Sequence, residues 1–202
     1  MEPIEFIGIR GGHGATTVAL AAAVTLAARG PTRISTSDRR GLCALVGIAH
    51  DGLPIPIAEH LDLALGEHEG DVIDCGTLEQ YFDEEPFDDE VAAHRQGPSA
   101  GLRIGVLRGP DYLGLRTLCE HAEDALDGLV VISEPGRALE PRDVEHVSGR
   151  PVLAVVDHTP VVARTIDAGL LVHRLGRLRE FAQLRTWITQ AAAEEAPCAA
   201  LS

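Results

Sequence analysis

The sequence predicts an α/β protein whose mostly parallel sheet is doubly wound and flanked by helices. Short apolar segments alternate with alanine- and leucine-rich helical segments along the 202 residues. The first apolar segment, residues 4–9, has almost no polar interruption, as is typical of a strand buried on both faces of a parallel sheet. A glycine-rich turn joins it directly to a helical segment, an order that aims backbone N–H groups at an anion.

The first half of the chain is expected to form three strands with helices between them. Strands are predicted over residues 4–9, 33–36 and 71–74. Helices are predicted over residues 16–29, 41–48 and 58–65, and Gly30-Pro31 ends the first of them.

Strands and helices alternate regularly again in the second half. Strands are predicted over residues 102–107, 129–132 and 152–156. Helices are predicted over residues 112–126, over 141–147 and in the last part of the chain up to 193. We therefore expect a single domain over residues 1–193, followed by a frayed tail at 194–202.

An acidic stretch interrupts this alternation near residues 79–100, where we expect a mobile insertion. Residues 79–90 read EQYFDEEPFDDE, with Tyr81, Phe82 and Phe87 among the carboxylates. Two interpretations stay open. Acidic and aromatic side chains could dock together on a basic, apolar groove, or the stretch could be a solvated insertion.

The formal net charge of −14 argues against general affinity for nucleic acid, so a protein is the expected partner. All 17 residues counted as Lys+Arg are arginine, and the chain therefore has no lysine. Cys43, Cys75, Cys119 and Cys198 are widely spaced, which favours neither a zinc site nor a disulfide framework. The longest apolar run, residues 18–28, is too short to cross a bilayer, and the expected location is the cytoplasm.

The stretch at residues 10–17, RGGHGATT, has the form of a phosphate-binding loop without its lysine. Glycines before a helix leave N–H groups free for phosphate, and Thr16 offers a hydroxyl to Mg²⁺. Ala15 stands where the lysine belongs, and Ile9 stands where the general G-x-x-x-x-G-K-[ST] pattern has its first glycine. His13 has no base partner or metal companion visible in the sequence and is interpreted as filler.

This loop resembles the deviant Walker A motif of the MinD/ParA superfamily of P-loop NTPases, KGGxGK[ST][ST]. Arg10 takes the place of the first lysine and Ala15 that of the second. Residues 35–38 resemble the family's D-x-D segment, with Thr36 in the place of the first aspartate, and residues 71–74 resemble its Walker B strand.

Later segments resemble actinobacterial MinD/CpaE-type proteins, namely residues 108–116, 133–139 and 157–170. The resemblance covers most of the chain except residues 54–65 and the acidic stretch. It implies a P-loop NTPase-like fold of the deviant Walker A type.

The resemblance also implies a nucleotide site formed by Gly11, Gly12, His13, Gly14, Ala15, Thr16 and Thr17. The candidates for catalysis are Arg10, Asp38 and Asp74, and the candidate Mg²⁺ ligands are Thr16 and Asp74. For Arg10 the alternatives are an arginine finger across a dimer and a solvated arginine. For Asp74 they are a magnesium ligand and a cap of the following turn.

The leading hypothesis is a degenerate MinD/ParA-like pseudo-ATPase, because both the loop lysine and the first switch aspartate are replaced. Such a protein would act as a regulatory or protein-interaction component, could form a homodimer, and would bind ATP and Mg²⁺ weakly or not at all. The alternative is an active dimeric ATPase in which Arg10 replaces the lost lysine chemistry. A CobQ-like ligase on the same fold is a third hypothesis, for which no second substrate motif is found.

The last helical segment carries an apolar stripe and several arginines. The stripe consists of Leu175, Leu178, Phe181, Leu184 and Ile188. MinD relatives use amphipathic terminal helices on membranes, so lipid contact is one interpretation. Closure of the domain core is the interpretation that we favour.

Overall fold

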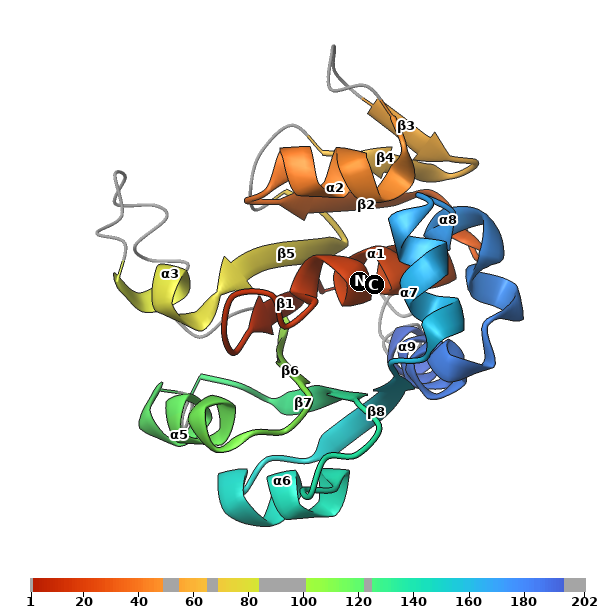
Figure 1. The fold of residues 1–202 in the computed structure, drawn as a ribbon. Helices are drawn as coiled ribbons and strands as arrows, with labels where there is room; N and C mark the ends of the chain where they lie inside the picture. The colour runs from red at the N-terminus through yellow and green to blue at the C-terminus, as the bar shows by residue number, and fades with distance from the viewer. Residues whose placement is uncertain (1, 49–54, 65–68, 84–100, 122–124, 195–202) are drawn as a thin grey trace.

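The computed structural model describes residues 2–48, 55–64, 69–83, 101–121 and 125–194 (Figure 1). These residues form an eight-stranded sheet with the order β3-β4-β2-β5-β1-β6-β7-β8. Every neighbouring pair is parallel except β3 and β4. The strands are β1 (Ile4–Gly8), β2 (Thr32–Thr36), β3 (Ile55–Ala58), β4 (Leu61–Leu63), β5 (Val72–Thr77), β6 (Leu102–Arg108), β7 (Gly128–Ser133) and β8 (Val152–Asp157).

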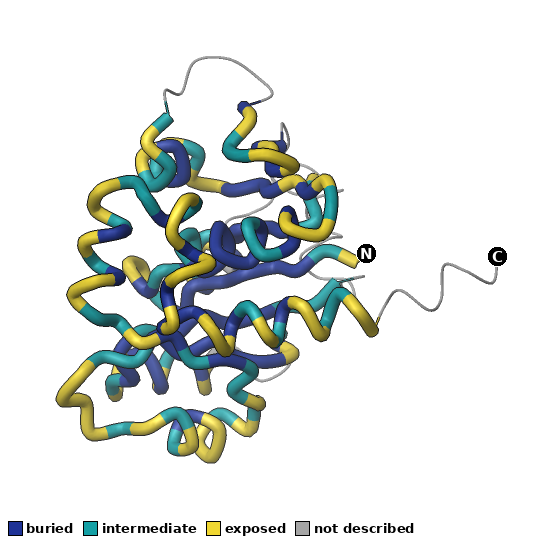
Figure 2. Tube along the Cα trace, turned by 90° about the vertical axis from the view of Figure 1, so that its right-hand side faces the viewer, coloured by how far each residue is buried: buried dark blue, intermediate teal, exposed yellow. Residues whose placement is uncertain are grey.

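Helices cover both faces of the sheet, which confirms the predicted doubly wound α/β class. One face packs against α1 (Ala15–Ala27), α2 (Arg39–Val46), α7 (Pro160–Asp167), α8 (Leu171–Arg174) and α9 (Ala182–Glu194). The other face packs against α3 (Leu78–Asp83), α5 (Tyr112–His121) and α6 (Pro141–Ser148). Figure 2 shows the buried residues concentrated along the middle of the molecule, between these two layers.

The central strands are apolar at successive positions because they bury side chains on both faces. Phe6 of β1 packs in the α1-side core and Ile7 in the opposite core. Val130 and Val131 of β7 divide in the same way. The alanines of α1 leave little side-chain bulk between helix and sheet, so α1 packs closely over β5 and β1 with most of its residues buried.

The prediction of a helix over residues 58–65 is wrong. Residues 55–63 form the antiparallel strands β3 and β4, and β4 pairs with β2. Leu61 and Leu63 are buried while Asp62 between them is exposed, which is the period of two of a strand. Pro56 lies on β3 at the edge of the sheet, where its missing N–H costs no ladder hydrogen bond.

Other predicted boundaries also change. The helix predicted over residues 112–126 is α5, which is described to His121, and Leu126 is not helical. Glu194, which the prediction assigns to a frayed tail, belongs to α9. Residues 195–202 lie outside the described residues.

The start of the acidic stretch is folded rather than irregular. Residues 78–83 form α3, and Tyr81 is 3% exposed in the core formed with α5 and α6. Tyr81 is therefore not available for the proposed docking of exposed aromatic residues. Phe87 and the rest of the predicted insertion lie outside the described residues.

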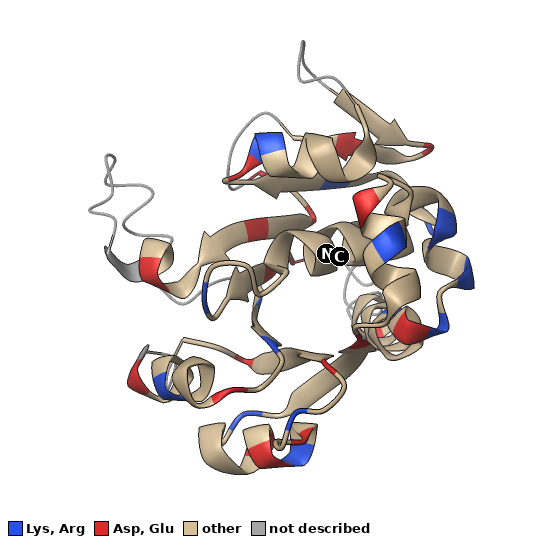
Figure 3. Ribbon diagram, viewed as in Figure 1, with Lys and Arg blue, Asp and Glu red and all other residues tan. Residues whose placement is uncertain are grey.

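The apolar stripe of the terminal segment is buried. Its five members are at most 5% exposed and pack in the α1-side core, as the favoured interpretation expects. The segment is interrupted by the 3₁₀ turns η1 (Leu175–Arg177) and η2 (Arg179–Phe181) before α9. Arg174, Arg177 and Arg179 are exposed, and Figure 3 shows arginines on the outer side of this part of the molecule. Within the described part of the chain, no helix is long and apolar enough to cross a membrane.

Candidate functional site

A candidate site lies at the carboxyl ends of the strands, where the chain connections diverge. After β1, α1 leads to β2 on one side; after β6, α5 leads to β7 on the other. The neighbouring strands β1 and β6 therefore form the switch point at which open α/β sheets bind ligands. A cavity of about 810 Å³ opens there and is lined by residues of the glycine-rich loop.

The glycine-rich loop has the backbone of an anion cradle. Gly12 and Gly14 have φ values of 78° and 86°, and the loop is closed by a 3.2 Å hydrogen bond from the His13 N–H to the Arg10 carbonyl. Gly14 is the N-cap of α1 and gives no side-chain cap, so the first N–H groups of α1 remain for a ligand. The positive φ of Gly14 favours glycine, and a Cβ there would also lie 2.8 Å from Ile132 Cδ1, so that this side chain would have to shift.

Ala15 lies at the position of the missing lysine. It is the first residue of α1, is 7% exposed and lines the cavity. A methyl group there supplies neither charge nor a hydrogen bond. Because the chain contains no lysine, no other lysine can take this role.

Asp74 lies in β5 opposite Thr36 of β2, and both oxygens of its carboxylate accept hydrogen bonds. It is 1% exposed, and its Oδ2 accepts a 2.8 Å hydrogen bond from Thr36 Oγ1. Its Oδ1 accepts a 3.3 Å hydrogen bond from the Gly76 N–H. Burial raises the pKa of Asp74, while hydrogen bonds from Thr16, Thr36 and Gly76 oppose this shift.

The site fits a phosphate and Mg²⁺ only in part. Thr16 and Asp74 line the cavity together and interact with each other, which suits a hydroxyl and a carboxylate that share a cation. Ala15, however, leaves the outer phosphates of a triphosphate without the charge that the loop lysine would supply. We therefore derive no hydrolytic step from this site.

The other two candidate catalytic residues also reach the cavity. Asp38 is the N-cap of α2, and its Oδ1 accepts a 2.8 Å hydrogen bond from the Gly41 N–H, so it has a local structural role. Arg10 lines the cavity, is partly exposed and forms no ion pair with the described residues. Gly12, His13, Gly14, Thr16 and Thr17 line the same cavity, whereas Gly11 is exposed and does not.

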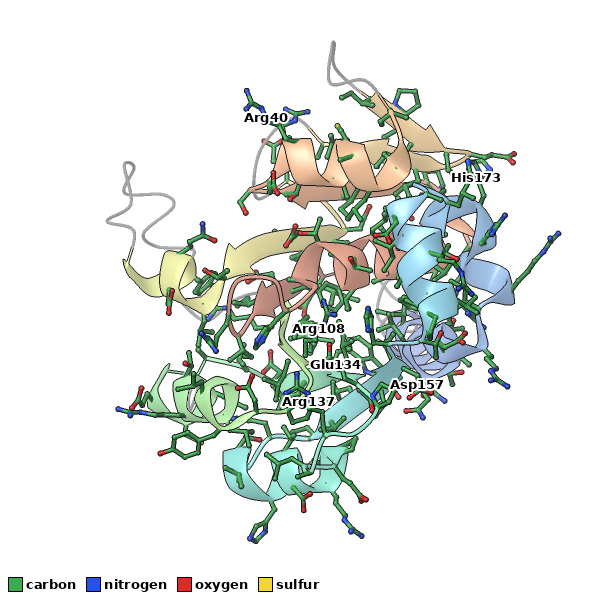
Figure 4. All side chains as sticks on the ribbon, viewed as in Figure 1. Arg40, Arg108, Glu134, Arg137, Asp157 and His173 are labelled. Carbon is green, nitrogen blue, oxygen red and sulfur yellow. The ribbon has the colours of Figure 1, made fainter. Side chains whose placement is uncertain are left out.

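Sequence inspection missed a charged cluster at the edge of the cavity. Arg108 Nε donates a 2.8 Å hydrogen bond to Glu134 Oε1, and Arg108 Nη2 lies 3.4 Å from His158 Nε2. Arg137 Nη2 donates to the other oxygen of Glu134 at 2.6 Å (Figure 4). Hydrogen bonds from Arg137 and Arg108 lower the pKa of Glu134, which stays ionised.

A strand pattern could have revealed this cluster. Arg108 is the last residue of β6, and a titratable residue comes directly after the end of β7 and of β8, in each case two positions after a residue of the α1-side core. The side chains of residues i and i+2 lie on the same face of a strand, so Arg108 points toward the α1 side, and the neighbouring strand ends bring the other two residues to it. The pairs are Val106 and Arg108, Ile132 and Glu134, and Val156 and His158.

His13 is not a solvated filler of the loop. It is 8% exposed, and its ring packs near the start of α5, where a Cβ on Gly114 would lie 3.3 Å from His13 Cε1. Its Nδ1 has no hydrogen-bond partner among the described residues. Burial lowers the pKa of His13, and the negative charge of Asp111 opposes that shift.

The far wall of the cavity is apolar. It is formed by Val156, Val162, Ala163, Ile166 and Phe181. A cavity with a loop of N–H groups at one end and an apolar wall at the other suits a ligand with a phosphate and a flat organic part.

Comparison with solved structures agrees with this arrangement. A MinD cell division protein from Aquifex aeolicus superposes with a TM-score of 0.66 at 14% identity, covering 96% of this chain and 98% of that one. MinD from Pyrococcus horikoshii, solved with Mg-ADP, superposes with a TM-score of 0.62 at 16% identity, covering 95% of each chain. A ParA family ATPase from Chlorobium tepidum gives 0.63 at 12% identity, covering 93% of this chain and 98% of that one. No protein-family model and no curated protein sequence matches the chain.

The class of fold is therefore the α/β fold of P-loop NTPases, with the ligand cavity over the strand-to-helix loop. More particularly, the chain has the fold of the MinD and ParA ATPases, as the loop resemblance predicts.

Proposed function

We propose that this chain is a MinD/ParA-type protein that keeps the nucleotide cavity of its fold but does not hydrolyse ATP. It acts as a regulatory or protein-interaction component in spatial positioning, partitioning, or pilus or secretion assembly. The observation that carries this proposal is Ala15, which lines the phosphate end of the cavity in a chain without lysine.

The loss of one charge-assisted contact has a large effect on phosphate binding. Hydrogen bonds to charged groups contribute about 1.5–3 kcal/mol, which corresponds to roughly ten- to hundredfold in affinity. Hydrolysis requires more, because charge develops on the transferred phosphoryl group in the transition state. The second altered element is Thr36, which stands in place of a switch aspartate and hydrogen-bonds to Asp74.

A protein partner suits the surface beside the cavity. Tyr112 and Leu113, at the start of α5, are 74% and 54% exposed. They follow Asp111, whose charge acts on His13 in the loop. Large exposed apolar side chains beside a ligand site are typical of protein contacts. In a solved complex with the same fold, MinD from Aquifex aeolicus is bound to MinC.

The direct test is ATP turnover by the purified chain with saturating Mg²⁺ and ATP. We expect phosphate release no faster than in the protein-free control. A turnover signal that copurifies with the chain and disappears in an Arg10→Ala variant would overturn the proposal.

The second candidate is an active dimeric ATPase. It is favoured by one observation: Arg10 lines the cavity and forms no ion pair with described residues, so its guanidinium is free to act on a ligand. In this case turnover should rise with protein concentration as dimers form, whereas no activity at any concentration would dismiss it.

A further inference from the structure

We propose that Arg108 is the residue that binds the phosphate of a nucleotide in this cavity, in place of the missing loop lysine. The inference rests on the proposed function in one respect, namely that the cavity keeps a nucleotide-type ligand. The positive charge that binds the phosphate would then come from the end of strand β6 rather than from the glycine-rich loop.

The register of the sheet places Arg108 beneath the start of α1. The N–H of Ile9, where the loop begins, donates a 3.0 Å hydrogen bond to the Val106 carbonyl of β6. Val106 packs in the α1-side core, and Arg108 lies two residues later on the same face of the strand. Arg108 and the loop residues Gly12 and Gly14 line the same cavity.

The guanidinium of Arg108 is held in place by neighbouring side chains, but not all of its N–H groups donate to them. Glu134 accepts from its Nε, and His158 lies near its Nη2. No hydrogen bond joins its Nη1 to the described residues, and the side chain is 37% exposed. Arg137 shares the same carboxylate, so Glu134 is divided between two guanidinium groups, and the charge of Asp111 also acts on Arg137. An arginine that is fixed in this way loses little entropy when it binds a phosphate.

A second observation points to a ligand in the same place. His13 lines the cavity, is more than nine-tenths buried at 8% exposure, and leaves Nδ1 without a partner among the described residues. Arg10 and Arg108 line the same cavity as His13, and their positive charges help to lower its pKa. A buried nitrogen without a partner destabilises the protein, and a bound ligand would relieve this cost.

The test is a titration of the purified chain with N-methylanthraniloyl-ADP in EDTA, so that protein charge alone faces the phosphates. Arg108→Met, which keeps an unbranched apolar side chain but removes the guanidinium charge, should weaken binding at least tenfold. The matched control is Arg116→Met, because Arg116 is exposed on α5 and pairs only with Glu120 among the described residues. This control should bind like the original chain. Arg108→Lys should lie between the two.

Adenosine distinguishes a phosphate contact from damage to the cavity. Displacement of the probe by adenosine, which has no phosphate, should show the same adenosine affinity in Arg108→Met as in the original chain. An equal loss for adenosine and for the labelled ADP would overturn the inference, because the residue would then act on folding. Pyrophosphate should compete more weakly with the probe in Arg108→Met, since it presents phosphate without a base.

Two further results would also overturn the inference. One is unchanged ADP affinity in Arg108→Met together with a tenfold loss in Arg10→Met, because Arg10 of the loop would then be the residue that binds the phosphate. The other is no binding of labelled ADP by the original chain up to millimolar concentration. Neither result touches the proposed lack of hydrolysis, which the turnover assay decides separately, and ATP hydrolysis would leave the Arg108 result standing.

Discussion

Thr36 Oγ1 donates a 2.8 Å hydrogen bond to Asp74 Oδ2, joining the neighbouring strands β2 and β5 beside the cavity that Asp74 lines. An aspartate at position 36 would instead place a second carboxylate against a buried one, and like charges at that distance repel. Thr36 also accepts a 3.0 Å hydrogen bond from the Asp38 N–H, so its hydroxyl connects both residues. The Thr36 hydroxyl therefore stabilises the buried carboxylate of Asp74.

Asp74→Asn should stabilise the protein at neutral pH. Burial raises the pKa of Asp74 above its value in the unfolded chain, so its ionisation in the folded state costs stability at every pH above that raised pKa. Asparagine removes the charge, and the threonine hydroxyls can donate to it or accept from it. We expect the melting temperature to rise by about 2–4 °C, which corresponds to ~1 kcal/mol for a chain of this size.

The gain from Asp74→Asn should shrink as the pH falls through the raised pKa of Asp74, because the folded carboxyl is then protonated and its burial no longer costs stability. Calorimetry at pH 7.5 and pH 4.5 measures this. A lower melting temperature for Asp74→Asn at pH 7.5 would contradict the stated cost of burial.

Ala15→Lys should restore tight phosphate binding. The side chain of residue 15 starts at the first turn of α1 and faces the cavity, so a lysine there could reach a phosphate held by the loop. We expect the affinity for a fluorescent ATP analogue to rise about ten- to hundredfold, and more with Mg²⁺ than without. Equal affinities in both proteins would mean that the loop does not hold the phosphates where this lysine can reach them.

Gly14→Ala should destabilise the fold, whereas Gly11→Ala should not. Gly14 has a φ of 86° and its Cβ would meet Ile132 Cδ1 at 2.8 Å. Gly11 has no atom within 4 Å of its Cβ position and no positive φ. We expect Gly14→Ala to cost about 1–2 kcal/mol from the left-handed conformation alone. Each variant adds one methyl group to the same loop, and urea denaturation of both measures the difference in their stability.

The stability of the protein should fall as the pH drops below the ordinary pKa of histidine. Burial lowers the pKa of His13 in the folded state, so the unfolded chain binds a proton first when the pH falls through about 6.5. Stability is therefore complete above that pH and is lost between it and the lowered pKa, by at most about 1.4 kcal/mol per pH unit. His13→Gln should flatten this part of the profile, as measured by urea denaturation from pH 7.5 to pH 5.

The matched control for His13→Gln is His173→Gln, since His173 is exposed on α8. It should keep the slope of the original chain. If the fall of stability with pH persisted in His13→Gln and disappeared in His173→Gln, the prediction would be wrong, because His173 and not His13 would then cause it.

Local patterns in the sequence were sufficient for much of the fold. Strands buried on both faces are apolar at successive positions, and β1 and β7 follow that rule. The helix predicted over residues 58–65 was wrong because the apolar pattern there is short. Leu61 and Leu63 are two positions apart, and a segment of this length does not distinguish a strand from a helix. Tyr81 shows a second limit, since an aromatic residue among carboxylates has the same sequence pattern whether it is exposed or, as here, buried.

By itself, the sequence determined the shape of the loop and its missing charge, because both depend on residues that are adjacent in the chain. The glycines at 12 and 14, the helix start and Ala15 all fall within four positions. Only the tertiary structure brought Arg108 to Glu134 and His158, which lie 26 and 50 residues further along the chain. Their meeting depends on the order and register of β6, β7 and β8, and these are set by packing against α1 and α9 across the whole domain.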